Sequence, residues 1–237
     1  MAIYAIEESQ RKAARVVGFA YLFALVTANF AELGVPAKLI VYGNAAQTAA
    51  NIIAHERLFR LAIASDMITF ATDVVLIAAL YVVLKPVNRN LALLAAFWGL
   101  VETSIMVVAI LHEFDMLQLL SGADYLRVLE ADRLHAMALL SVGAYGSAYQ
   151  VGLWFFGLRS LIFAYLWFRS RYIPRALAAW GVFSSLLVVT CTWIVVVSPT
   201  LASPLLVPSL GPIGIFELAM GFWLLFMKLR PSITPAA

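Results

Sequence analysis

The chain has 237 residues, of which 64% are hydrophobic and only 12% are charged, and its formal net charge is +3 at pH 7. A soluble domain carries about 25% charged residues, so the composition excludes an ordinary soluble protein and indicates a polytopic membrane protein. The single cysteine, Cys191, excludes an intramolecular disulfide and the Cys/His spacings of zinc or haem sites. The basic residues flank apolar runs and form no patch with interleaved aromatics, so we expect no nucleic-acid partner.

Six apolar runs approach the roughly 20 residues that a membrane-spanning helix needs. They predict an all-α bundle of six transmembrane helices that forms a single integral membrane domain over residues 1–237. A basic segment precedes the first run as in a signal peptide, but we expect this helix to be retained because five further spans complete the topology. The fourth run is long enough to be tilted, kinked or projecting. The predicted spans are residues 14–31, 58–84, 91–112, 136–168, 176–198 and 212–227.

Lysines and arginines are concentrated at one side of the predicted topology. Because cytoplasmic loops carry this excess, we expect both termini to be cytoplasmic and the protein to lie in the inner (plasma) membrane of a cell, with the lipid bilayer as its main partner. The basic residues on this side are Arg11, Lys12, Arg15, Lys85, Arg89, Arg169, Arg171, Arg175, Lys228 and Arg230.

The segments on the other side contain signals for further structure. Asn44 followed by Gln47 has the spacing of a capping box and predicts a short helix over residues 45–55 that runs into the second span. Asp124 is similarly expected to begin a helix that merges with the fourth span. Residues 199–212 carry no charge and several prolines, so we expect no regular helix there.

Several segments distributed over nearly the whole chain carry a family resemblance. They are residues 58–61 with Asp66, residues 80–81, 85–95, 101–102, 152–157 and 168–175, and Glu217 with residues 223–225. On these segments the chain resembles the bacterial DUF4386 family of polytopic membrane proteins. Arg159 has no match in the family pattern. The resemblance implies a membrane protein and supplies no activity, cofactor, ligand or catalytic residue.

Four ionisable residues from four predicted spans share one depth: Asp73, Glu102, Arg159 and Glu217. At a helix rise of 1.5 Å per residue, each lies roughly 15–18 Å from the nearest cytoplasmic turn, near the middle of a core about 30 Å thick. A charge at that depth costs roughly 2.5–3.5 kcal/mol. Asp66 lies two turns from Asp73 and nearer the outer boundary. We interpret these five residues as a candidate binding site for a ligand or a proton.

If the four groups converge, three carboxylates face one guanidinium. Arg159 can pair with Glu102 or Glu217, and the surplus acids, with Asp73 as the main candidate, must bind a proton, bind a cation or open to water. This favours binding of a small molecule or ion, or proton-coupled transport. A purely structural polar network is the alternative, as in a structural or regulatory subunit that oligomerises or binds another membrane protein.

Three histidines, His55, His112 and His135, lie near the predicted non-cytoplasmic face, and each has an acid close in sequence. Histidine and carboxylate are suitable zinc or iron ligands, so a metal-dependent intramembrane enzyme is a second functional hypothesis. The sequence contains no HExxH motif, serine elbow or nucleotide-binding loop. Enzymatic activity therefore depends on convergence of these histidines.

Overall fold

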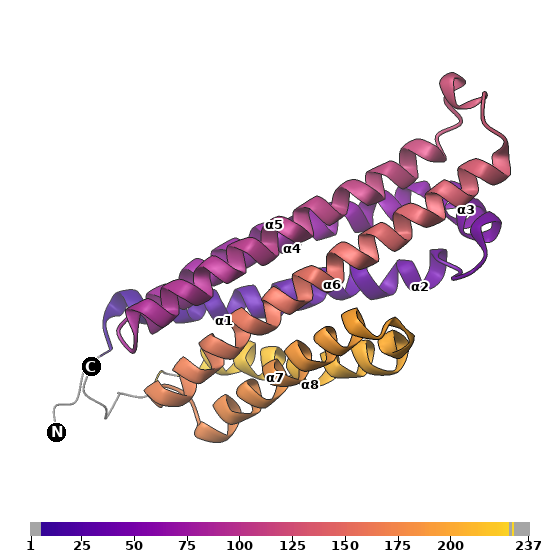
Figure 1. The fold of residues 1–237 in the computed structure, drawn as a ribbon. Coiled ribbons are helices and arrows are strands. Elements are labelled where there is room, and N and C mark those ends of the chain that lie inside the picture. The colour runs from indigo at the N-terminus through magenta and orange to yellow at the C-terminus, as the bar shows by residue number, and fades with distance from the viewer. Residues whose placement is uncertain (1–5, 228, 230–237) are drawn as a thin grey trace. The chain divides into compact units, whose positions relative to one another are not determined.

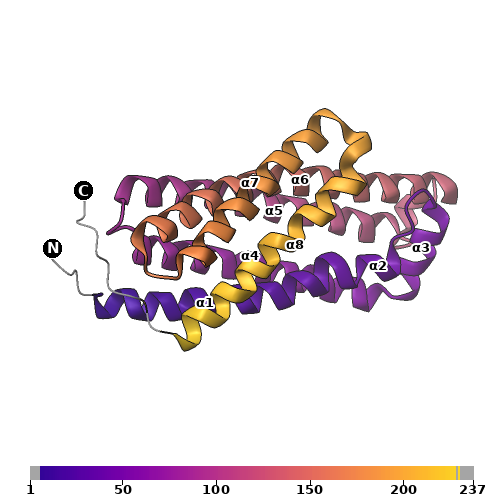
Figure 2. The ribbon, with the colours of Figure 1, turned by 90° about the horizontal axis from the view of Figure 1, so that it is seen from below.

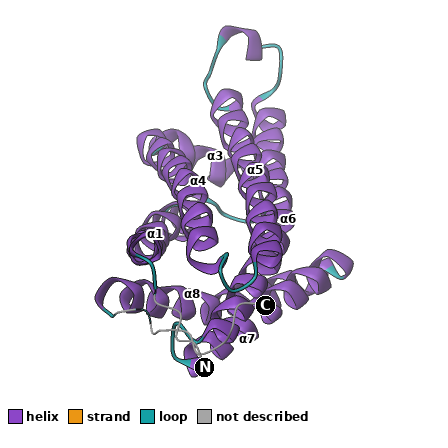
Figure 3. Cartoon of the chain, turned by 90° about the vertical axis from the view of Figure 1, so that its left-hand side faces the viewer, coloured by secondary structure: helices purple, strands orange, loops and turns teal. Residues whose placement is uncertain are grey.

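The computed structural model describes residues 6–227 and residue 229. These residues form helices joined by short loops, without a strand among them (Figure 3). Within the described residues, six helical segments are long and apolar enough to cross a membrane, which confirms the predicted class. They are Glu8–Leu39, Glu56–Leu84, Arg89–Leu119, Ala131–Ser170, Arg175–Val197 and Leu206–Phe226.

The individual elements follow one another along the chain as labelled in Figure 1. They are α1 (Glu8–Ala28), the π-helix η1 (Asn29–Gly34), α2 (Pro36–Leu39), α3 (Ala45–Ala54), α4 (Glu56–Leu84), α5 (Arg89–Leu119), the 3-10 turn η2 (Asp124–Leu126), α6 (Ala131–Ser170), α7 (Arg175–Val197), the 3-10 turn η3 (Pro199–Leu201) and α8 (Ala202–Phe226).

The first four spanning helices extend beyond their predicted apolar runs, and α8 begins before its run, whereas α7 (Arg175–Val197) nearly coincides with the predicted residues 176–198. The first run continues through η1 and α2, because Val35 donates to the Phe30 carbonyl at 3.0 Å and so closes a π-type turn without ending the helix. The fourth span is an unbroken helix of 40 residues, about 60 Å long at 1.5 Å per residue. It therefore exceeds the thickness of the hydrocarbon core, as its length in the sequence predicts.

The predicted short helix after Asn44 is confirmed as α3. The Asn44 side chain accepts a hydrogen bond from the Gln47 backbone amide at 2.9 Å, while the Gln47 side chain donates to Asn51 and does not return to Asn44. The helix ends at Ala54, and only His55 separates it from α4. The prediction of a helix from Asp124 into the fourth span is wrong beyond its first turn. Leu126 bonds back to Ala123 and Leu129 to Leu126, so the chain forms successive three-residue turns there, and α6 starts only at Ala131.

The expectation of no regular helix in residues 199–212 is also wrong. A 3-10 turn is followed directly by α8, which contains Pro208 and Pro212 in its interior. An apolar segment at membrane depth must satisfy its remaining backbone groups internally, and this requirement outweighs the bonds lost at two prolines. The Pro212 carbonyl also accepts a hydrogen bond from the Trp180 indole at 2.9 Å.

The chain divides into two compact units. The first contains Met1–Leu25, Thr72–Thr103 and Gln150–Ala237, and the second contains Val26–Ala71 and Ser104–Tyr149. Two of the basic residues used for the orientation, Lys228 and Arg230, lie outside the described residues.

Small residues allow close helix packing in the first unit. A Cβ placed on Gly18 of α1 would lie 2.9 Å from the Gly221 carbonyl oxygen of α8, where the two helices cross (Figure 2). In the α7–α8 hairpin, a Cβ on Gly181 would lie 2.6 Å from the Phe216 ring. Membrane helices associate largely through such close van der Waals contact, so these glycines determine how near α8 lies to its neighbours.

Candidate functional site

Five buried or partly buried side chains of the first unit interact with one another, and we name them the Arg159 cluster. They come from five helices, and Arg159 interacts electrostatically with each of the other four. The structure thus brings together all four residues that share one predicted depth, and it adds a tyrosine. The members are Tyr21 of α1, Asp73 of α4, Glu102 of α5, Arg159 of α6 and Glu217 of α8.

Arg159 holds two of the acids at different distances. Its Nε lies 2.5 Å from Glu102 Oε2, whereas its Nη2 lies 3.8 Å from Asp73 Oδ1. The side chains of Arg159 and Glu102 are each 4% exposed, while that of Asp73 is 13% exposed. Glu102, one of the two partners that the sequence offers, therefore forms a close ion pair with Arg159, and Asp73 is more weakly held and more accessible than Glu102.

The neighbours of Arg159 explain why its side chain reaches this position. A Cβ on Gly99 would lie 3.1 Å from Arg159 Cδ and 2.7 Å from Ile77 Cδ1, so the absence of a side chain at residue 99 leaves room for the arginine stem. The guanidinium carbon lies 5.1 Å from the Phe156 ring centroid, a cation–π distance. Glycine and phenylalanine thereby position the cation against the acids.

The charges of the Arg159 cluster do not balance. One guanidinium, which stays protonated, faces the carboxylates of Asp73, Glu102 and Glu217. Uncompensated carboxylates in a medium of low dielectric constant are strongly unfavourable. The cluster can therefore hold a proton, a cation or the cationic group of a small molecule beside the Arg159–Glu102 pair.

Asp66 belongs to a different group of residues, within the second unit. We name this group the Glu113 cluster: Glu32 of η1, Asp66 of α4, Glu113 of α5, and Tyr145 and Tyr149 of α6. In the sequence, Asp66 lies only two helical turns from Asp73, which suggested a common site. Depth along a helix does not predict which side chains of other helices a residue contacts. The tyrosines, one helical turn apart, and Glu32 and Glu113 were not identified as site residues by sequence reasoning. In the sequence, the one feature that could have identified these four residues is that they are polar side chains within apolar helices.

The three histidines also lie in the second unit, in separate environments. His55 contacts the Asn51 carbonyl at 3.1 Å, His112 lies 3.4 Å from Asp115, and the buried Nδ1 of His135 has no hydrogen-bond partner. Among the described residues, no three His, Cys, Asp or Glu side chains are arranged to hold a metal ion. The structure therefore lends no geometric support to the metal-enzyme hypothesis.

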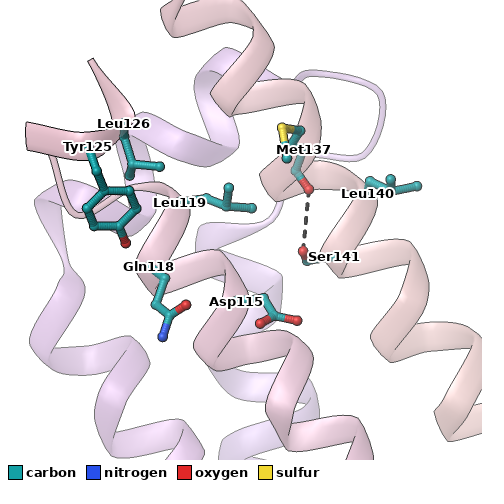
Figure 4. A pocket seen from close by; sticks show the side chains of 8 residues that line it. All are labelled: Asp115, Gln118, Leu119, Tyr125, Leu126, Met137, Leu140 and Ser141. Carbon is teal, nitrogen blue, oxygen red and sulfur yellow. Dashed lines mark hydrogen bonds between the residues drawn. The ribbon is translucent and has the colours of Figure 1, made fainter. Parts of the chain in front are cut away.

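A pocket of about 340 Å³ lies between the end of α5, the turn η2 and the start of α6 (Figure 4). Its walls are mostly apolar, with one acid, Asp115, that already lies beside His112. The lining residues are Asp115, Gln118, Leu119, Tyr125, Leu126, Met137, Leu140 and Ser141. Nothing in this lining selects a particular ligand.

Comparison with known proteins identifies one family. A family model described as "Domain of unknown function (DUF4386)" matches residues 16–227, which is most of the chain. No curated protein matches the chain. No solved structure matches it either.

Proposed function

We propose that this chain, which belongs to the DUF4386 family, binds a proton or a small cation at Asp73 and couples that binding to the binding or transport of a small molecule across a membrane. Glu102 and Arg159 form the fixed part of the site in this proposal. Asp73 is the exchangeable part, and Tyr21 and Glu217 complete the polar surroundings.

The observation that supports this proposal most directly is the unequal pairing of Arg159. The guanidinium lies 2.5 Å from Glu102 and 3.8 Å from Asp73. Because the attraction between charges falls with distance, Asp73 receives less compensation than Glu102. Its side chain is also about three times as exposed, at 13% against 4%. A carboxylate that is weakly compensated and accessible can gain and lose a proton or cation more readily than one locked in a close pair.

The charge balance explains why such an occupant is needed. Arg159 can neutralise one carboxylate fully, and Glu102 takes that position. Ionisable groups within membrane-spanning helices are rare and mark substrate and ion pathways and proton relays. A purely structural network would keep the charge of Asp73, which lies 3.8 Å from the guanidinium, neutralised permanently. The proposal requires that this neutralisation be reversible.

Charge displacement in a reconstituted membrane tests the proposal without knowledge of the small molecule. The purified protein in liposomes is adsorbed on a solid-supported membrane, and a rapid pH step, or a step in Na⁺ or K⁺ at constant pH, is applied. We expect a transient current from at least one of these steps in the wild type, and its loss in Asp73→Asn.

The matched control is Asp124→Asn, which makes the same chemical change at a side chain that is 87% exposed and paired with Arg127. It should leave the current unchanged. A folded wild-type protein that gives no current for a proton, Na⁺ or K⁺ step would overturn the proposal and favour the structural network. A current that persists in Asp73→Asn would contradict the role of Asp73.

We further propose that both termini are cytoplasmic and that the protein resides in the plasma membrane. If all six apolar helices cross the membrane, an even number of spans would leave both termini on one side, and the basic residues of the 85–90 and 169–175 segments would share that side with the basic start of α1. Positively charged loops remain cytoplasmic during insertion. This orientation would make the outer ends of α5 and α6 face the exterior.

A further inference from the structure

The Glu113 cluster of the second unit has no role in the proposed function, although two of its acids, Asp66 and Glu113, are more deeply buried than Asp73. Asp66 is 0% exposed and Glu113 is 5% exposed. Glu113 acts electrostatically on Asp66, and Glu32 acts on Glu113. Three carboxylates from three helical segments therefore influence one another inside the second unit.

The carboxylates of Asp66 and Glu113 have little that would stabilise negative charge. In the described part of the chain, neither forms an ion pair with a lysine, arginine or histidine. Both oxygens of Asp66, and Oε2 of Glu113, are buried without a hydrogen bond of acceptable geometry. A buried anion in this state is unfavourable by several kcal/mol, whereas a protonated carboxyl group carries no net charge and can itself donate a hydrogen bond.

Two tyrosines of α6 supply the polar contacts of the cluster. The Tyr149 hydroxyl donates a short hydrogen bond to the Glu32 carboxylate. The Tyr145 hydroxyl faces Asp66 as its hydrogen-bonding neighbour, although the contact falls outside strict hydrogen-bond geometry. Their rings stack with centroids 6.0 Å apart. The two hydroxyls thus connect one face of α6 to acids on two other segments, as residues one turn apart can.

Glu32 reaches this cluster from an irregular part of the first span. It lies on η1, the π-helix Asn29–Gly34, which continues α1. Single π-turns within α-helices occur frequently at functional sites because they change the direction in which a side chain points. An unbroken α-helix would turn Glu32 to a different angle, so the π-turn contributes to its contact with Tyr149.

We propose that Asp66 and Glu113 bind protons and form, with Glu32, Tyr145 and Tyr149, a second proton-binding site within the second unit. Among the described residues, the acids do not converge as three ligands around one metal position. One proton on Asp66 and one on Glu113 would neutralise both carboxylates, and this does not require three ligands to meet at one metal ion. Tyr145 and Tyr149 hold Asp66 and Glu32 through their hydroxyl groups.

Infrared spectroscopy of the purified protein in lipid tests this site directly, because a protonated carboxyl group has a carbonyl band that a carboxylate lacks. At neutral pH we expect the wild type to show this band. Asp66→Asn and Glu113→Gln should each remove part of it, and Asp124→Asn should leave it unchanged. Size-exclusion chromatography and circular dichroism establish that each variant is folded.

Tyr145→Phe provides a second test that keeps every acid in place. Removal of the hydroxyl should shift the carbonyl band of Asp66, because the polar group that faces this carboxyl group is lost, whereas Tyr165→Phe, outside the cluster, should not. The proposal is overturned if the wild type lacks the carbonyl band at neutral pH. It is also overturned if the band disappears when choline chloride is replaced by NaCl or CaCl₂, because a metal cation would then be the occupant of the site. Since the Arg159 cluster shares none of these residues, charge displacement at Asp73 can fail while this band persists.

Discussion

Glu102 Oε2 lies 2.5 Å from Arg159 Nε, and each side chain is 4% exposed. A pair this close and this buried acts as one neutral unit, because neither charge can be hydrated separately. Arg159 therefore has a fixed partner, and its Nη2 lies 3.8 Å from Asp73 Oδ1.

Replacing Glu102 by glutamine should destabilise the protein markedly. Removing one partner of a buried ion pair costs roughly 3–5 kcal/mol, and we expect the loss to lie at or below the lower end of this range because Asp73 remains 3.8 Å from the guanidinium. The measurement is unfolding of the purified variant in detergent, compared with the wild type under identical conditions.

The double variant Glu102→Gln/Arg159→Gln is the control for that result. Because the two residues are in direct contact, their effects should not add, and the double variant should lose less stability than the sum of the single variants. Strict additivity would contradict the close pair. Glu56→Gln, which breaks an exposed pair with Arg60, should cost no more than about 1 kcal/mol.

Substitution of Gly18 by alanine should separate α1 from α8. The added Cβ would lie 2.9 Å from the Gly221 carbonyl oxygen and 3.0 Å from the Leu225 nitrogen. These are backbone atoms that cannot rotate away, so we expect a loss of about 1–3 kcal/mol from overpacking, measured as a lower unfolding temperature in detergent. In the α6 control Gly143→Ala, the Cβ meets nothing within 4 Å, and we expect a gain of about 0.5–1 kcal/mol. Equal effects of the two substitutions would contradict the α1–α8 contact.

Substitution of Asn44 by alanine should loosen the first turn of α3. The side chain of Asn44 accepts the Gln47 amide at 2.9 Å, and loss of such a cap typically costs about 1 kcal/mol. Hydrogen exchange should accelerate in the first turn of α3 and remain unchanged in α4. Gln47→Ala keeps the backbone amide and hence the cap, so rapid exchange in that variant alone would argue against capping as the cause.

The proposed orientation predicts opposite labelling of two connections. In a Cys191→Ala background, Asn90→Cys at the start of α5 and Ser121→Cys after its end are treated with a membrane-impermeant maleimide in intact cells. Ser121→Cys should react from outside, and Asn90→Cys only after permeabilisation. The reverse pattern would place the termini outside the cell.

The number and class of the helices could be predicted because a span depends on local hydropathy and length alone. The extra length of the first four spans and the earlier start of α8 could not, since they depend on contacts beyond the apolar run. The prediction of no regular helix in residues 199–212 was wrong because it considered only the cost of proline within a helix. It did not include the need of backbone groups in a membrane for hydrogen-bond partners within the protein. Asp124 failed as a helix start because the following residues form three-residue turns.

Part of the candidate site was also accessible from the sequence. Equal depth along four helices was enough to select Asp73, Glu102, Arg159 and Glu217, which the structure brings together. Depth could not decide between Glu102 and Glu217 as the close partner of Arg159, because that choice depends on how each helix is rotated. For the same reason it could not separate Asp66 from Asp73, nor reveal the tyrosines that face Asp66 and Glu32.

Charge displacement after a pH or cation step, compared between the wild type, Asp73→Asn and Asp73→Glu in the same liposomes, tests the central claim most directly. The account predicts a transient current in the wild type, its loss in Asp73→Asn, and a retained but altered current in Asp73→Glu, which keeps the carboxylate. A current of equal size in the wild type and Asp73→Asn, with both proteins folded, would contradict the assignment of Asp73 as the exchangeable acid.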